Sequence, residues 1–177
     1  MKREPYKHMN CSVAAALEVV GEPWTLLILR DAYQHVRRFE EFQRHLGIAR
    51  NILTARLKKL VDYGILVKVQ YQDRPRRFEY RLSEKGAALF PVIVCLKEWG
   101  DHFGEKSGYG PPLNYVDKES GELVRPALID QSSGKHIELT SVRAVPGMGS
   151  HPRSTDFMNW IERQRADGQG GKIASAA

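Results

Sequence analysis

The chain has 177 residues, of which 42% are hydrophobic and 27% are charged. This length and composition suit one compact domain of about 100 to 110 residues with an appendage. The longest apolar runs fall far short of the roughly 20 residues that a membrane span needs, so we expect no membrane partner and a cytoplasmic location. Two cysteines and six scattered histidines predict neither a disulfide framework nor a metal site, and we expect no cofactor.

The net charge of +6 is concentrated in one segment of the chain. Residues 49–85 contain ten Lys and Arg against four Asp and Glu, an excess as large as that of the whole chain. Such a local positive field is typical of a surface that binds nucleic-acid phosphates. Simple solvation of an exposed helix face is the alternative explanation.

The N-terminal part predicts two helices after a polar arm at residues 1–11. The first helix covers residues 12–20, with Ser12 as its N-cap and Gly21 as its end. The second is expected to open at Pro23 and to run through WTLLILRDAYQ. Residues 24–29 are apolar nearly all round, so we expect them to be buried at the centre of the domain.

Residues 39–63 predict a helix-turn-helix. In FEEFQRHL the apolar residues recur at helical spacing, and Gly47 suits the end of this short helix. The following ARNILTARLKKLVDY places Leu53, Leu57 and Leu60 on one side and polar residues on the other. Two short helices joined in this way present the second helix to the major groove of DNA.

After Gly64 the apolar period changes to two. ILVKVQY and FEYRLS are rich in β-branched and aromatic residues and flank QDRPRR, which predicts a two-stranded hairpin with a basic tip. A helix-turn-helix followed by such a hairpin is a winged helix-turn-helix, whose wing contacts the DNA backbone or minor groove.

A long helix is predicted from Ser83 to Gly104, with Pro91 either bending it or lying near its start. A winged helix has little core left for the apolar stripe of this helix. We therefore expect it and the N-terminal helix to pack against a second copy in a two-fold homodimer, while packing within the same chain is the alternative. The expected dimer interface residues are Val13, Leu17, Leu89, Val92, Leu96, Trp99 and Phe103.

The C-terminal part reads as a linker followed by a β-rich extension. DKESG at 117–121 recurs as DQSSG at 130–134, each between β-prone runs, which predicts a three-stranded meander. DFMNWIERQ predicts a short helix, and residues 167–177 a disordered tail. We therefore expect an α+β chain: a winged-helix and dimerisation domain at 1–107, a small β extension at 108–147, and a loop, helix and tail at 148–177.

Three stretches carry a resemblance to a known family: CSVAAALEVVGEPWTLLILRDA at 11–32, RRFEEFQRHLGIARNILTARLKKLVDYGIL at 37–66, and FEYRLSEKGAALFPVIVCLKEWGDHF at 78–103. They resemble the HxlR family of bacterial winged-helix regulators, relatives of the MarR group. The resemblance implies a homodimer that binds a double-stranded DNA operator as repressor or activator, and no enzyme. In many members an N-terminal cysteine responds to oxidants, quinones or aldehydes, and Cys11 occupies that position. Ser12 and Pro23 replace a proline and a basic residue common in the family.

The DNA-binding candidates fall into three groups. The outward side of the second helix suits contacts with base edges, since Arg matches guanine, Asn matches adenine and Thr meets a thymine methyl. These base-contact candidates are Arg50, Asn51, Thr54 and Lys58. Candidates for phosphate contacts are Arg37, Arg38, Arg56 and Lys59. Candidates for entry into a narrow minor groove are Arg74, Arg76 and Arg77.

Cys11 is the candidate for redox sensing. It precedes a predicted helix, whose unpaired N–H groups and dipole favour a thiolate, and its oxidation within a dimer interface would reorient the DNA-contacting helices. An inert, half-buried residue is the alternative, and we expect Cys95 to be packed. The remaining alternatives are a winged-helix regulator that responds to a small ligand or to no thiol signal, and a winged helix used for protein or RNA contacts.

Overall fold

The computed structural model describes residues 6, 8–104, 110–150 and 152–166, and the predicted tail at 167–177 lies outside them. The chain divides into two compact units. One unit is residues 15–127, which contains the winged helix, and the other holds the described residues before Ala15 and after Ala127. The first unit ends at residue 127, and the domain boundaries expected at 107 and 147 stay predictions.

The two N-terminal helices are α1, Ser12–Val20, and α2, Thr25–Tyr33. Helix α2 begins two residues after Pro23 because Trp24 has a left-handed backbone, with φ of 75°, that a helix cannot include. The predicted burial is confirmed for Ile28 and Leu29, which are fully buried. It is wrong for Trp24 and Leu27, which are 37% and 41% exposed because only one side of α2 faces the core.

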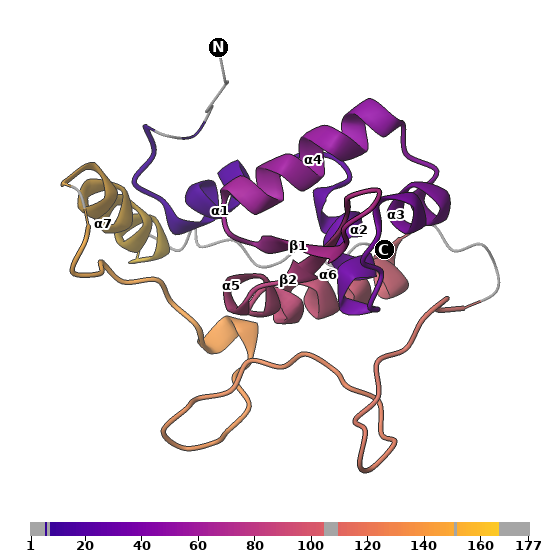
Figure 1. The fold of residues 1–177 in the computed structure, drawn as a ribbon. Helices are drawn as coiled ribbons and strands as arrows, with labels where there is room; N and C mark the ends of the chain where they lie inside the picture. The colour runs from indigo at the N-terminus through magenta and orange to yellow at the C-terminus, as the bar shows by residue number, and fades with distance from the viewer. Residues whose placement is uncertain (1–5, 7, 105–109, 151, 167–177) are drawn as a thin grey trace. The chain divides into compact units, whose positions relative to one another are not determined.

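The predicted helix-turn-helix is confirmed by α3, Phe39–Leu46, and α4, Arg50–Asp62 (Figure 1). Gly47 ends α3 in the left-handed conformation, with φ of 61°, and its N–H donates to the carbonyl of Gln43. The buried faces of both helices join α2 in one hydrophobic core. The fully buried side chains of this core include Ile28, Leu29, Phe42, Leu53, Leu57 and Leu60.

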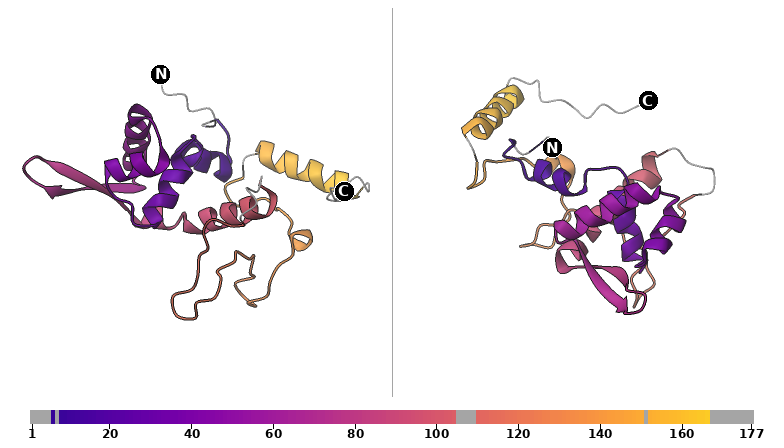
Figure 2. Two further views of the ribbon diagram at one scale, coloured as in Figure 1. Left: turned by 90° about the vertical axis from the view of Figure 1, so that its right-hand side faces the viewer. Right: turned by 45° about the horizontal axis from the view of Figure 1, so that its top comes forward.

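The predicted wing is the antiparallel pair of β1, Leu66–Gln72, and β2, Arg77–Leu82. Leu66 lies opposite Leu82, and the register shifts between Gln70 and Gln72. Figure 2 shows the hairpin projecting from the helices of its unit. Its base is tied to the helix-turn-helix, because the N–H of Tyr80 donates to the carbonyl of Arg37 at 2.8 Å and Arg38 forms a single bridge with Glu79.

The long helix predicted from Ser83 is broken into α5, Glu84–Ala87, and α6, Phe90–Phe103. Ser83 caps α5 by accepting the N–H of Gly86 at 3.0 Å. Pro91 lies in the first turn of α6, where its missing N–H is not needed. A Cβ at position 86 would lie 2.2 Å from the carbonyl oxygen of Ile65, so glycine is required where α5 passes the end of α4.

No described helix alone is long and apolar enough to cross a membrane, and only the bent pair α1 and α2 passes that test, by length and composition.

The predicted three-stranded meander is wrong, although the repeat that suggested it is real. In the first turn, Asp117 Oδ1 accepts the N–H groups of Glu119 and Ser120, and a single bridge joins Val116 to Leu123. These hydrogen bonds, led by the Ser120 N–H, lower the pKa of Asp117. The aspartate at the start of each turn closes it through hydrogen bonds to backbone N–H groups, so the turn forms without the hydrogen-bond ladder of a β-sheet.

The second unit repeats this turn at Asp130, whose Oδ1 accepts the N–H groups of Ser132 and Ser133, with one bridge from Ile129 to His136. Among the described residues, β1 and β2 form the only sheet. The unit also contains a 3-10 turn at Leu139–Ser141 and helix α7, Pro152–Ala166, which contains the short helix predicted there.

Candidate nucleic-acid interface

The outward side of α4 carries the four residues predicted to contact bases, Arg50, Asn51, Thr54 and Lys58, and all four are exposed. Three of them have contacts that orient them. The guanidinium of Arg50 lies 4.8 Å from the ring centre of Phe39, Thr54 Oγ1 donates to the carbonyl of Arg50, and Lys58 pairs with Asp62 at 2.9 Å. Arg50 and Asn51 stand in the first turn of α4, the end that approaches base edges in helix-turn-helix proteins.

Arg56 and Lys59 face the turn between α1 and α2. Lys59 Nζ lies 2.9 Å from Glu22 Oε1, and Arg56 pairs with Glu22 Oε2 and donates its Nε to the carbonyl of Pro23 at 3.1 Å. The Lys59 side chain is only 15% exposed and the Arg56 side chain only 21%. The contacts hold α4 against the preceding helices, so this geometry favours a structural role for both cations.

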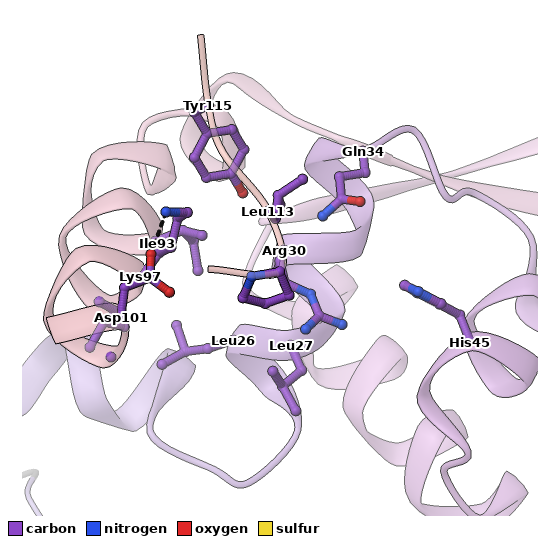
Figure 3. Close-up of a pocket in the computed structure, with 13 residues that line it drawn as sticks. Leu26, Leu27, Arg30, Gln34, His45, Ile93, Lys97, Asp101, Leu113 and Tyr115 are labelled. Carbon is purple, nitrogen blue, oxygen red and sulfur yellow. Dashed lines mark hydrogen bonds and ion pairs between the residues drawn. The ribbon is translucent and has the colours of Figure 1, made fainter. Parts of the chain in front are cut away.

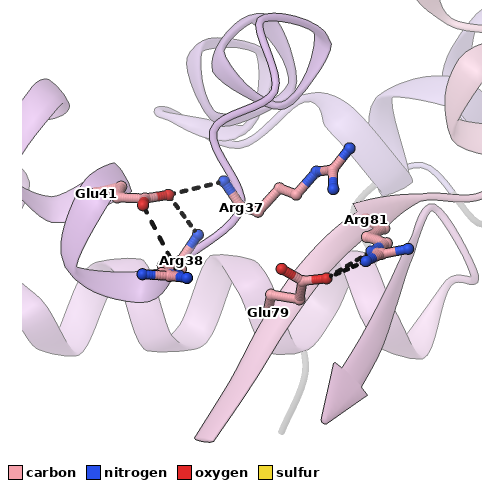
Figure 4. A network of polar contacts seen from close by, with 5 residues as sticks. All are labelled: Arg37, Arg38, Glu41, Glu79 and Arg81. Atoms are coloured by element: carbon pink, nitrogen blue, oxygen red, sulfur yellow. Dashed lines mark hydrogen bonds and ion pairs between the residues drawn. The ribbon is translucent and has the colours of Figure 1, made fainter. Parts of the chain in front are cut away.

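Arg37 and Arg38 lie where α3 meets the wing (Figure 4). Glu41 Oε2 accepts the backbone N–H of Arg38 at 2.9 Å and that of Arg37 at 3.2 Å, and these bonds, led by the one from Arg38, lower the pKa of Glu41. The guanidinium of Arg38 lies 4.7 Å from the ring centre of Tyr71 on β1. Figure 4 shows the Arg37 side chain extending away from Glu41. The backbone here is thus fixed while both guanidinium groups remain near the surface.

The tip of the wing presents Arg74, Arg76 and Arg77, which are all exposed. Within the part of the chain that the structure describes, none of the three forms an ion pair or a cation–π contact. The turn itself is held by the Gln72 side-chain amide, which donates to the carbonyl of Arg74 at 2.9 Å. The three positive charges are therefore available to an external anion.

The expected dimer residues of α1 and α6 lie mostly on exposed faces. Val13 and Leu17 of α1 are exposed, as are four large side chains of α6, with exposures between 42% and 68%. Those of α6 are Val92, Leu96, Trp99 and Phe103. Leu89 differs, because it is partly buried against the core of its own chain.

Both cysteines are exposed thiols. Cys11 immediately precedes α1, as predicted, although Ser12 is the first helical residue and not the cap. The expected packing of Cys95 is wrong in the single chain. Cys95 lies one helical turn from the exposed Val92 and one from the exposed Trp99, so it shares their exposed side of α6. Across the described ranges, no group of three or more His, Cys, Asp and Glu side chains could hold a metal ion.

The pair α3 and α4 followed by the hairpin defines a winged helix-turn-helix protein. The sequence profile of HxlR-like helix-turn-helix proteins matches residues 19–108, and the chain belongs to this family of transcriptional regulators, which are not enzymes. An uncharacterized HTH-type transcriptional regulator of Mycobacterium tuberculosis is 46% identical over 138 residues, which cover 78% of this chain and 87% of that protein.

Two solved structures also match most of the chain. PA1607, described as a candidate transcription factor, is 36% identical with a TM-score of 0.72, over 80% of this chain and 99% of that one. PA1374 from Pseudomonas aeruginosa is 35% identical with a TM-score of 0.59, over 83% of this chain and 99% of that one. Matches of this length exceed the winged helix alone, so both similarities include part of the extension after α6.

Proposed function

We propose that the protein is a sequence-specific DNA-binding regulator that acts as a homodimer on an operator. The observation that carries this proposal is the exposure of Arg50, Asn51 and Thr54 at the start of α4. Arg50 can donate two hydrogen bonds to guanine O6 and N7, Asn51 can pair with adenine N6 and N7, and Thr54 can meet a thymine methyl. A good bidentate contact contributes about 1 to 3 kcal/mol of discrimination between bases.

Phosphate contacts would come from the edges of the same surface. Arg37 and Arg38 at the start of α3 have half-exposed or exposed side chains next to the proposed base-contacting residues. The wing arginines Arg74, Arg76 and Arg77 suit a narrow minor groove. We leave Arg56 and Lys59 out of this surface because Glu22 forms ion pairs with both.

An operator on the chromosome also requires the protein to act in the cytoplasm.

The homodimer is supported by the exposed apolar side chains of α6. Val92, Leu96, Trp99 and Phe103 recur at helical spacing and remain uncovered in the single chain. Large apolar patches of this kind mark interaction surfaces, and two-fold pairing is the commonest assembly of soluble proteins. A two-fold axis there would present two α4 helices to successive major grooves, about 34 Å apart on the DNA.

We also propose that Cys11 senses oxidants or electrophiles. Its thiol is exposed and lies directly before α1, where a small oxidant can reach it. Oxidation by diamide would take two electrons and two protons from two thiols and join them as a disulfide. The second thiol would come from the partner copy or from a small thiol.

The test is a gel shift with the upstream DNA of the protein's own gene, at two salt concentrations, with and without diamide. Wild type is compared with Cys11→Ser and with the control Cys95→Ser. We expect salt-sensitive binding that diamide abolishes in wild type and Cys95→Ser but not in Cys11→Ser. Binding that diamide leaves unchanged would contradict thiol sensing alone and favour a regulator with a small ligand or no thiol signal. Absence of duplex binding in every condition would contradict DNA binding and favour protein contacts.

A further inference from the structure

A cavity of about 500 Å³ lies between α2, α6 and residues 112–115 (Figure 3). Its walls are mainly apolar and include Leu26, Leu27, Ile93, Leu96 and Leu113. The volume falls within the range of roughly 300 to 1,000 Å³ that small-molecule sites occupy. Nothing in the proposed DNA contacts uses this space.

The wall formed by residues 112–115 is fixed by aromatic packing. The Tyr115 ring meets Phe90 edge to face at 5.1 Å between centroids, and Phe90 meets Tyr33 at 5.0 Å. The Tyr33 hydroxyl donates to the carbonyl of Gly86 at 2.5 Å, and burial raises the pKa of Tyr33 to about 12. The segment after α6 is thus held against the winged helix at the cavity.

Arg30 lines this cavity and is held by a buried carboxylate. Its Nε and Nη2 both contact Asp31 Oδ1, at 2.9 and 2.8 Å, and Asp31 is fully buried. The other oxygen of Asp31 lies 2.7 Å from His45 Nδ1 on α3. This leaves Arg30 Nη1 with no acceptor among the residues that the structure describes. A buried carboxylate therefore orients the guanidinium while one of its nitrogens remains available.

Two further donors stand near Arg30. The Tyr115 hydroxyl has its pKa raised by burial, so it is a protonated donor at neutral pH, and the charges of Arg30 and Lys97 act on it in the opposite direction. Lys97 Nζ lies 2.5 Å from Asp101 Oδ2, which fixes the ammonium on the α6 wall. A guanidinium, a phenol and an ammonium paired with the Asp101 carboxylate thus line one mainly apolar space, together with Gln34 and His45.

We propose that this cavity binds a small, mainly hydrocarbon molecule with a single carboxylate. The apolar walls would take up the hydrocarbon part, and the carboxylate would accept hydrogen bonds from Arg30 Nη1 and the Tyr115 hydroxyl. Such a ligand would touch α3 through His45 and α6 through Lys97. It would bridge the first helix of the helix-turn-helix and the helix of the proposed dimer.

The experiment is calorimetric titration of the full chain, without DNA, with 2-naphthoate and with its neutral analogue 2-naphthamide. We expect naphthoate to bind at least tenfold more tightly than naphthamide, because the amide carbonyl can accept a hydrogen bond from Arg30 but only the carboxylate also brings a negative charge to the guanidinium. Equal affinity for both, or no binding of naphthoate, would overturn the proposal. Since no DNA is present, either result leaves the proposed operator binding untouched.

Variants locate the binding. Tyr115→Phe keeps the ring packed on Phe90 and removes only the hydroxyl, so naphthoate should bind several-fold more weakly while the melting temperature stays unchanged. Arg30→Met should bring naphthoate down to the affinity of naphthamide, and Arg44→Met, the same change on the exposed side of α3, should have no effect. Unchanged affinity in Tyr115→Phe and Arg30→Met would overturn the proposal. The proposal would also be overturned if the affinity for naphthoate fell as the protein concentration was raised and dimers formed, because a second copy would then fill the cavity.

Discussion

The wing arginine Arg76 offers a quantitative test of the DNA surface. It is exposed and has no ion pair among the described residues, so replacing it with glutamine removes a cation without releasing an internal anion. Each phosphate charge that a protein cation neutralises, also from within the minor groove, contributes about 0.9 to the slope of log K against log salt concentration. A dimer in which Arg76 neutralises one phosphate per subunit should therefore lose about 1.8 from its slope in Arg76→Gln.

The same relation sets the loss of affinity. Between about 1 M salt, where electrostatic binding is small, and about 0.1 M salt, the logarithm of the salt concentration changes by about one. A change of about 1.8 in the slope therefore lowers log K at about 0.1 M by about 1.8, which is roughly 60-fold or about 2.4 kcal/mol. The measurement is fluorescence anisotropy of a labelled operator duplex over several salt concentrations.

Arg125→Gln is the control for net charge, because Arg125 is a 71% exposed arginine outside the predicted DNA contacts; unlike Arg76 it has an ion-pair partner, Glu98. Its slope should equal that of wild type. The reasoning is refuted if Arg76→Gln keeps the wild-type slope. It is also refuted if Arg125→Gln lowers the slope equally, since net charge and not a local contact would then explain the effect.

Three further outcomes are expected. Trp99→Asp should yield a monomer in sedimentation analysis and weaken operator binding at least tenfold, and a stable dimer would contradict the proposed α6 interface. Leu57→Ala removes a fully buried side chain of α4 and should lower the free energy of unfolding in urea by about 2 to 5 kcal/mol. Glu41 has a lowered pKa, so its contribution to stability is present above the unfolded value near 4.5 and lost as pH falls through the lower folded value. The stability difference between wild type and Glu41→Gln should shrink over that acidic range, and a pH-independent difference would contradict this assignment.

Local sequence patterns determined the central architecture. The positions of α3, α4 and the hairpin follow from a helical period that changes to a period of two after Gly64, because each element needs only its own residues to define its apolar face. Gly47 marked the end of α3 through its left-handed backbone, and Ser83 marked the start of α5 through its side-chain cap; both signals are local. The exposure of the side of α4 that we propose contacts bases follows from the same periodicity.

The tertiary structure decided which charges and apolar groups are available to partners. Glu22 engages Lys59 across 37 positions in sequence and so removes a cation that the helix period alone assigned to DNA. The contact between Arg38 and Tyr71, and the buried Asp31 between Arg30 and His45, likewise join separate elements and leave no local signature. Trp24 and Leu27 are apolar yet exposed, because burial depends on what packs against a helix and not on its composition. The cavity beside Arg30 exists only because residues 112–115 return to α2 and α6, a long-range contact that periodicity does not encode.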